Sequence, residues 1–257
     1  MGRKDYIRAI SKIKENDNYI DITYDFFEDY LNGVDPDKYN FKLKHWHKIL
    51  WEKPLPYKNN VLTLEKHEYG LTHVSDLGEF YFTSDAIIHT YSRHSNYSFI
   101  INEIPRNEIN TFLKVASQIG AYIIFPGNVV NKKQTINSAR GFHPRIYDRF
   151  DLTLECIRLY YSGIITKVEN PLGEVLLRYD DFFKLFSDFK GYCDFFLLQD
   201  LTKESFTKIN FFIPFNGFST KPRPSSVDEY KVYMENSINF IRKRNNRIIE
   251  YNKMKLK

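Results

Sequence analysis

Apolar and polar residues alternate along parts of the chain with a period of two, and along other parts with the period of a helix. The two-residue alternation over 61–68 and 71–85 predicts strands. Apolar residues at helical spacing predict a helix over 105–119, and an S-x-x-E capping box opens a last helix over 227–248. A sequence that mixes both periods in this way is typical of an α+β fold.

Shorter apolar runs predict the remaining elements. We expect helices over 41–51 and 174–189, and strands over 20–27, 99–104, 121–125 and 192–201, the last paired with 208–214. The prediction is therefore one α+β domain over residues 1–257, with a mostly antiparallel sheet and packed helices. Residues 242–257 are expected to form a basic C-terminal helical tail that lies free of the core.

The stretch from 145 to 162 is predicted to be a buried helix. Pro144 suits the start of a helix and Gly163 suits its end. Most of its circumference is apolar or aromatic, whereas a surface helix gives far more of its circumference to charge. On a wheel at roughly 100° per residue, four charged residues fall within about 80° of one another: Asp148, Asp151, Glu155 and Arg158.

Buried charges are costly unless they are paired, hydrogen-bonded or bound to a metal. One interpretation is that Arg158 and its neighbours neutralise the acids and join two layers of the fold. The other is that the acids line a cleft as catalytic residues, binding Mg²⁺ or acting as a general base. In that case further basic side chains arrive from the preceding turn: Arg140, Arg145 and Arg149.

The loop over 128–140 is the second candidate for function. It is rich in Asn, Lys, Ser and Thr, and its Asn137 and Arg140 could donate hydrogen bonds to a phosphate or a base. Neither glycine-rich nucleotide fingerprint occurs in it. With Arg145, Arg149 and Arg158 it makes up a candidate ligand-binding set; the alternative is a solvated loop.

Histidines offer weaker candidates. His45 and His47, two residues apart, point in opposite directions on a helix and are interpreted as surface or capping residues. A metal site could in principle be formed by four further residues: His73, Asp76, Asp85 and His89. The sequence nevertheless lacks H-E-x-x-H and clustered cysteines.

Composition narrows the classes of protein. Hydrophobic residues make up 42% and aromatic residues 17% of the 257 residues, which indicates a folded chain with a large core.

The two cysteines, Cys156 and Cys193, lie in apolar runs and are expected to be small buried hydrophobes, which favours a reducing compartment. Without an apolar run of about 18 residues or a signal peptide, the chain is expected to be cytoplasmic. The net charge of +5 is concentrated in the last 16 residues, so the body is not a typical nucleic-acid binder.

Several phrases form a recognisable set: LGEFYFTSD, IIFPG, TINSARG, DRFDLTLECIRLYY and FKGYCDFFLLQD. Together they resemble a family of uncharacterised bacterial proteins that is classed only as a domain of unknown function. The resemblance implies a bacterial, cytoplasmic, single-domain protein and carries no residue roles with it.

Two functions follow as hypotheses. The chain binds or acts on a phosphate-bearing ligand, RNA or a nucleotide, through the Arg/Asn loop and the acidic stripe. Alternatively, it is a non-catalytic interaction or regulatory module, as in a toxin or phage-defence system. Whether it is an enzyme, and in which oligomeric state it works, stays open at this stage.

Overall fold

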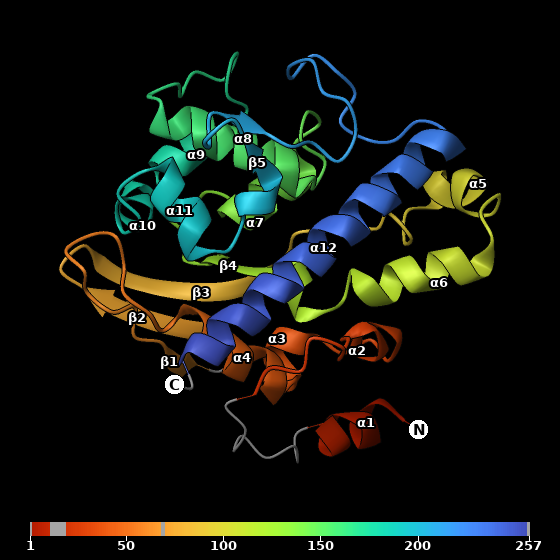
Figure 1. Ribbon diagram of the computed structural model, residues 1–257, viewed down its shortest axis with the longest axis horizontal. Coiled ribbons are helices and arrows are strands. Elements are labelled where there is room, and N and C mark those ends of the chain that lie inside the picture. The colour runs from red at the N-terminus through yellow and green to blue at the C-terminus, as the bar shows by residue number, and fades with distance from the viewer. Residues whose placement is uncertain (1, 11–18, 68–69, 256–257) are drawn as a thin grey trace.

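A four-stranded antiparallel sheet forms the centre of the fold (Figure 1). The computed structural model describes residues 2–10, 19–67 and 70–255. In the sheet, β1 (Glu65–His67), β2 (Gly70–Ser75) and β3 (Gly78–Ala86) are consecutive neighbours. The fourth strand, β4 (Tyr122–Pro126), joins the other edge of β3 after a long excursion and pairs Ile123 with Asp85.

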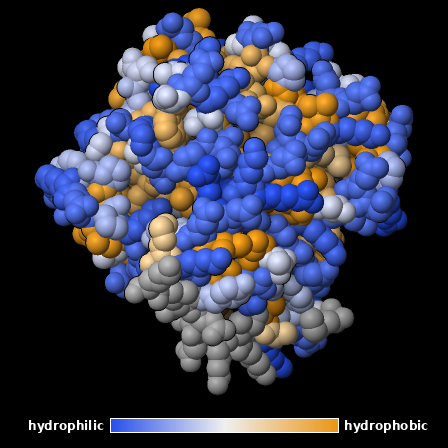
Figure 2. All heavy atoms as spheres, viewed as in Figure 1, coloured by the Kyte–Doolittle hydropathy of each residue, from blue (hydrophilic) through white to orange (hydrophobic). Residues whose placement is uncertain are grey.

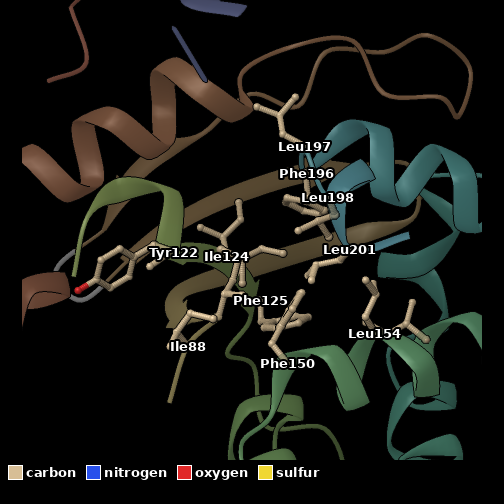
Figure 3. Packing of buried hydrophobic residues seen from close by; sticks show 14 of the residues in the cluster. Ile88, Tyr122, Ile124, Phe125, Phe150, Leu154, Phe196, Leu197, Leu198 and Leu201 are labelled. Atoms are coloured by element: carbon tan, nitrogen blue, oxygen red, sulfur yellow. The ribbon is translucent and has the colours of Figure 1, made fainter. Parts of the chain in front are cut away.

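The strand β4, which was predicted over 121–125, is completely buried and rich in β-branched and aromatic residues, which favour strands. All of its residues are buried, as the run YIIF demands, and Figure 3 shows Ile124 and Phe125 packed among Phe150, Leu198 and Leu201. Helix α8 and the segment that follows α11 therefore both pack against this strand. One continuous hydrophobic cluster extends from Ile20 to Ile248, so the aromatic-rich composition is used in a single core.

Helices surround the sheet. Their bounds are α1 (Arg3–Ile10), α2 (Phe27–Leu31), α3 (Pro36–Tyr39), α4 (Phe41–Trp51), α5 (Ser98–Ile101), α6 (Arg106–Val115), α7 (Ile136–Phe142), α8 (Phe150–Tyr161), α9 (Gly173–Leu177), α10 (Asp180–Lys184), α11 (Phe189–Phe195) and α12 (Val227–Lys255). Short 3-10 turns cover Ser95–Tyr97, Ile119–Ala121 and Gln199–Leu201, and β5 (Thr202–Lys203) pairs with β6 (Lys208–Ile209). In Figure 1, α7 to α11 lie on one side of the sheet and α2 to α4 on the other.

The long helix α12 crosses the molecule and ends near β1 (Figure 1). Its capping box forms as expected, with the amide of Glu229 donating to Oγ of Ser226 at 3.2 Å. The prediction that its basic end lies free of the core is wrong for Arg244, whereas Arg242 and Lys243 are exposed as predicted. Arg244 is fully buried and donates to the carbonyl oxygens of Phe196, Gly120 and Tyr122 at 2.7–3.2 Å. These three residues lie where α11 ends and β4 begins, and backbone groups at the ends of helices and strands need partners from elsewhere.

The α+β class, the antiparallel sheet, the helix at 41–51 and the strands at 71–85 are confirmed. Three predicted strands are wrong. Residues 20–27 form turns that lead into α2, residues 99–104 form α5 and a turn, and residues 192–201 contain the end of α11. All three are short apolar runs, whose periodicity cannot separate a strand from a buried helix.

Two predicted helices are also corrected. Residues 174–189 divide into α9 and α10. The helix predicted over 145–162 begins only at Phe150, since Tyr147 and Asp148 have φ of 49° and 63° and cannot be helical. Its predicted burial is confirmed, because Phe150, Leu154 and Ile157 are completely buried.

His47 is a further correction to the sequence interpretation. It is buried rather than at the surface, with Nε2 at 2.9 Å from Oγ of Ser84 and Nδ1 accepting from the indole N–H of Trp51. Both cysteines are buried and unpaired, as expected.

Hydrophilic residues dominate the face on which α12 lies, and the hydrophobic ones there form separate small groups (Figure 2). Within the described part of the chain, every helix is too short or too polar to cross a membrane.

Candidate functional site

Arg140 joins three parts of the fold at one point. It lies on α7 and is completely buried. Its Nη1 lies 2.6 Å from Oδ2 of Asp85, at the end of β3, and 2.8 Å from Oδ1 of Asp148. Its Nε donates to Oγ1 of Thr153 on α8 at 3.1 Å. One guanidinium therefore holds two carboxylates that lie far apart in the sequence.

The turn that carries Asp148 is held by backbone contacts. The amide of Asp148 donates to the carbonyl of Arg140 at 3.1 Å, and Nη2 of Arg140 donates to the carbonyl of Asp148 at 2.9 Å. Tyr147 and Asp148 both lie in the left-handed region, which is uncommon for residues other than glycine and carries a cost in free energy. Such conformations concentrate at functional sites because the surrounding structure has to enforce them.

The pKa values of the two carboxyl groups beside Arg140 shift in opposite directions. Burial raises the pKa of Asp85, and the charge of Arg140 offsets this only in part. Burial acts in the same direction on Asp148. There, however, the charge of Arg140 and a hydrogen bond from His89 outweigh it and lower the pKa of Asp148. As the pH falls, Asp85 is thus protonated first and Asp148 stays ionised.

Asp148 begins a hydrogen-bonded chain of three side chains. Its Oδ2 lies 2.8 Å from Nδ1 of His89, and Nε2 of His89 lies 2.9 Å from Nε2 of His94. With the carboxylate ionised, Nδ1 of His89 carries the proton and its Nε2 is the acceptor. Nε2 of His94 then has to be the donor, which leaves Nδ1 of His94 as an unprotonated nitrogen. We refer to Asp148, His89 and His94 as the relay.

A cavity of about 250 Å³ borders the relay. His89 and His94 line it together with Arg93 and the hydroxyl-bearing residues Tyr30, Thr90, Ser92 and Ser117. A second cavity, of about 420 Å³, shares Tyr30, Ala86 and Arg93 with the first, and its lining includes Asp85. Arg93 thus lies between the two cavities. Its Nη2 donates to the carbonyl of Tyr30 at 3.2 Å.

The other acids of the predicted stripe have different partners. Asp151 and Arg149 are completely buried, and Nε of Arg149 donates to Oδ1 of Asp151 at 3.0 Å. Oδ2 of Asp151 also accepts from the amide of Phe212 at 2.9 Å, and Nη1 of Arg149 donates to the carbonyl of Pro222 at 2.8 Å. This pair fastens the loop between β6 and α12 to the start of α8.

Glu155 and Arg158 form a local pair, with both hydrogen bonds at 2.7 Å and with both side chains partly exposed. Three carboxylates therefore do not converge, because the turn at Tyr147 and Asp148 removes Asp148 from the helix. Of the three acids, only Asp148 contacts Arg140, which lies on α7.

The predicted loop donors are also used internally. Arg145 donates to the carbonyl oxygens of Lys167 and Val168. Asn137, with its amide nitrogen turned toward Asp85, donates to both carboxylate oxygens at 3.2 Å. Oδ1 of Asn128 accepts from the amide of Tyr81 at 2.6 Å. The loop is fastened to the sheet by these contacts.

The metal arrangement considered from the sequence does not assemble. His73 bonds to the carbonyl of Thr63 at 2.9 Å, and Asp76 pairs with Lys58 at 2.6 Å. Across the described residues, no group of three or more His, Cys, Asp and Glu side chains is placed to hold a metal ion.

The sequence analysis did not identify His94 and Arg93, which lie in a short polar stretch between β3 and α5. His89 was considered only as a metal ligand. The one usable signal was the pair of histidines five residues apart, and its partner Asp148 lies more than fifty residues further along the chain.

Comparison with known proteins places the chain in a described family. A model described as "Family of unknown function (DUF6994)" matches residues 20–248. This range includes Arg140 and all three relay residues. Neither the curated proteins nor the solved structures contain a match.

Proposed function

We propose, for a chain that belongs to this family of unknown function, a role in acid–base catalysis on a small phosphate-bearing ligand. The observation that carries the proposal is the relay from Asp148 through His89 to His94 at the wall of a cavity. A carboxylate that orients an imidazole is the arrangement by which many enzymes prepare a general base.

The lining of the relay cavity favours an anion. Among the lining residues that the structure describes are one guanidinium, two imidazoles and several hydroxyls, and no carboxylate. Arginine recognises phosphate through several fixed donors, and Arg93 is exposed at the boundary of both cavities. The arginines first considered for this task, Arg140 and Arg149, are fully buried and paired with carboxylates, so the proposal assigns the ligand contact to Arg93.

The protonation state of His94 suits a general base. Burial, together with the neighbouring His89 and Arg223, lowers the pKa of His94, which favours the neutral imidazole at neutral pH. When Nδ1 of His94 takes a proton from a water, the proton on its Nε2 can pass to His89, next to the ionised Asp148. Arg140 holds that carboxylate in place.

The reaction that fits is hydrolysis of a phosphate ester. The oxygen of the activated water forms a bond to phosphorus, and the ester P–O bond breaks. The leaving oxygen keeps the electron pair and takes a proton from solvent, and the relay returns its own proton to solvent. General-base assistance of this kind contributes about 10²–10⁴-fold to a rate.

The test is a screen of phosphate monoesters, nucleotides and short RNA for release of phosphate, with and without Mg²⁺. We expect turnover in the wild type, a loss of about 10²-fold or more in His94→Ala, and a raised KM in Arg93→Gln. His67→Ala is the matched control, because His67 is an exposed histidine outside the relay. Equal activity in His94→Ala and the wild type would contradict the proposal.

One observation favours the non-catalytic alternative. Arg140, Arg149 and Arg244 are all completely buried and hold separate parts of the fold together, which is the organisation of a rigid scaffold. Ligand binding that requires Arg93 but proceeds without turnover would support a regulatory module, including one in a toxin or phage-defence system.

A further inference from the structure

A groove of about 560 Å³ lies between the loop that carries Arg223 and the turn that carries Tyr147. Three aromatic rings line it, those of Tyr97, Phe99 and Tyr147, together with three prolines. Two cations, Lys221 and Arg223, belong to the lining, and no carboxylate is among its described members. The groove therefore combines flat apolar surfaces with positive charge.

Arg223 is held in place by the rings. Its guanidinium carbon lies 3.8 Å from the ring centre of Tyr147 and 5.5 Å from that of Tyr97. Stacking on aromatic faces fixes the plane of the guanidinium and leaves its N–H groups pointing outward along the edge. Nη1 of Arg223 is buried and meets no acceptor within the described part of the chain. A buried donor of this kind favours an anionic acceptor from a ligand.

The backbone on both sides of Arg223 is fastened. The carbonyl of Pro222 accepts from Nη1 of Arg149, and the carbonyl of Pro224 accepts from the hydroxyl of Tyr97, both at 2.8 Å. The nearby carboxylate of Glu229 is already bound by the amide and the hydroxyl of Ser225, at 2.7 Å each. Arg223 is therefore presented in a fixed position, and a ligand would not have to order this loop.

Phe99 contributes an exposed aromatic ring to the groove. Its ring is 63% exposed, which is unusual for a phenylalanine in a chain whose other rings are mostly buried. The face of an exposed ring is a platform on which a nucleobase stacks. Lys221, also exposed, adds a second positive charge on the same wall.

We propose that this groove binds a nucleotide unit, with the base against Phe99 and the phosphate on Arg223. The combination of rings, prolines and cations matches the way in which single nucleotides and single strands are held. The volume lies within the range of small-molecule sites. The groove shares no lining residue with the two cavities near the relay, so this inference stands apart from the proposed catalytic role.

The experiment is a titration of the full chain with AMP, with a short single-stranded oligoadenylate, and with inorganic phosphate. We expect saturable binding of AMP, weaker binding of phosphate alone, and a loss of about tenfold or more in affinity for Arg223→Gln. A comparable loss is expected for Phe99→Ala. If AMP binds as tightly as the oligomer, the natural source is a free nucleotide; if the oligomer binds much more tightly, the source is a strand.

Two matched controls and one further variant keep the test decisive. Lys203→Gln removes an exposed cation elsewhere, and Phe142→Ala removes an exposed ring elsewhere; both should bind AMP normally. Arg223→Lys keeps the positive charge but loses the planar guanidinium that stacks on Tyr147, so it should also weaken binding. This variant provides the test if Arg223→Gln does not fold. Arg93→Gln, which changes the relay cavity and not the groove, should bind AMP in this groove as the wild type does, even if turnover is impaired.

Three results would overturn the inference. The first is equal weakening in Arg223→Gln and Lys203→Gln, which would indicate unspecific attraction by charge. The second is binding of phosphate as tight as that of AMP, because the rings would then contribute nothing. The third is tighter binding of a phosphotyrosine peptide than of AMP, which would assign the groove to protein recognition.

Discussion

Tyr147 and Asp148 are consecutive in the chain, yet they serve two different places. Both have left-handed backbone conformations, with φ of 49° and 63°. The ring of Tyr147 lies under the guanidinium of Arg223, and the carboxylate of Asp148 meets His89 at 2.8 Å. The strained turn thus presents one residue to the groove beside Arg223 and the next to the relay. This relationship links the two candidate sites through a single peptide unit.

Asp148→Asn tests the relay at its origin. Asparagine tolerates the left-handed region, so the backbone of the turn should be kept. The variant removes the negative charge that stabilises a proton on the relay, and we expect turnover to fall by about 10²-fold or more.

The dependence of the rate on pH in the same variant tests whether Asp148 acts through His94. Asp148 raises the pKa of His94, whereas burial and His89 lower it. Without Asp148 the pKa of His94 should fall further, so the acid limb of the pH–rate profile should move to lower pH. An unchanged profile would mean that the carboxylate does not act through the histidines.

The Asp151–Arg149 pair should matter for stability. Asp151→Ala leaves Arg149 buried without its carboxylate and releases the amide of Phe212. We expect a loss of about 3–5 kcal/mol in the free energy of unfolding, measured by denaturant titration. Glu155→Ala is the comparison, because its partly exposed pair with Arg158 is worth at most about 1 kcal/mol. Similar losses in both variants would refute the distinction between the two pairs.

Arg244 should behave as a core residue rather than as a solvated cation. Arg244→Met removes hydrogen bonds to three carbonyl oxygens, which then stay buried without donors. Each such group costs about 1–3 kcal/mol, so the melting temperature should fall by several degrees at least. Arg242→Met changes an exposed neighbour on the same helix and should stay within about 0.5 kcal/mol of the wild type.

His47 makes the fold sensitive to acid. Burial lowers the pKa of His47 from 6.5 to about 3, with a smaller contribution from the charge of Arg244. In the unfolded chain the residue takes up a proton near pH 6.5, whereas in the folded chain it does not. The stability is therefore complete above pH 6.5 and is lost as the pH falls toward 3. At pH 4 the loss should amount to about 3 kcal/mol.

His47→Gln provides the measurement. Its unfolding free energy at pH 7 should lie below that of the wild type, because buried hydrogen bonds to Ser84 and Trp51 are disturbed. Between pH 7 and pH 4, however, it should fall by about 3 kcal/mol less than the wild type does. Parallel curves for the two proteins would show that another group causes the acid sensitivity.

Long periodic stretches were predictable because local pattern and tertiary burial agree there. Val227 to Ile248 carries a capping box and an apolar face, and β3 carries an alternating run, so each forms the element that its sequence favours. The burial of α8 was predictable for the same reason. Short apolar runs such as 99–104 were not, because their conformation depends on what packs around them.

The sequence alone determined the α+β class, the antiparallel sheet, the buried position of α8 and the presence of charge on that helix. Only the tertiary structure decided what the charge does. It placed Asp148 on a strained turn beside His89, buried Asp151 with Arg149, and brought Arg244 to the ends of β4 and α11. The reason is physical: what a buried charge does depends on its partners, and several of these lie tens of residues away, as Asp85 does from Arg140 and Gly120 from Arg244. No periodicity along the chain reports such partners.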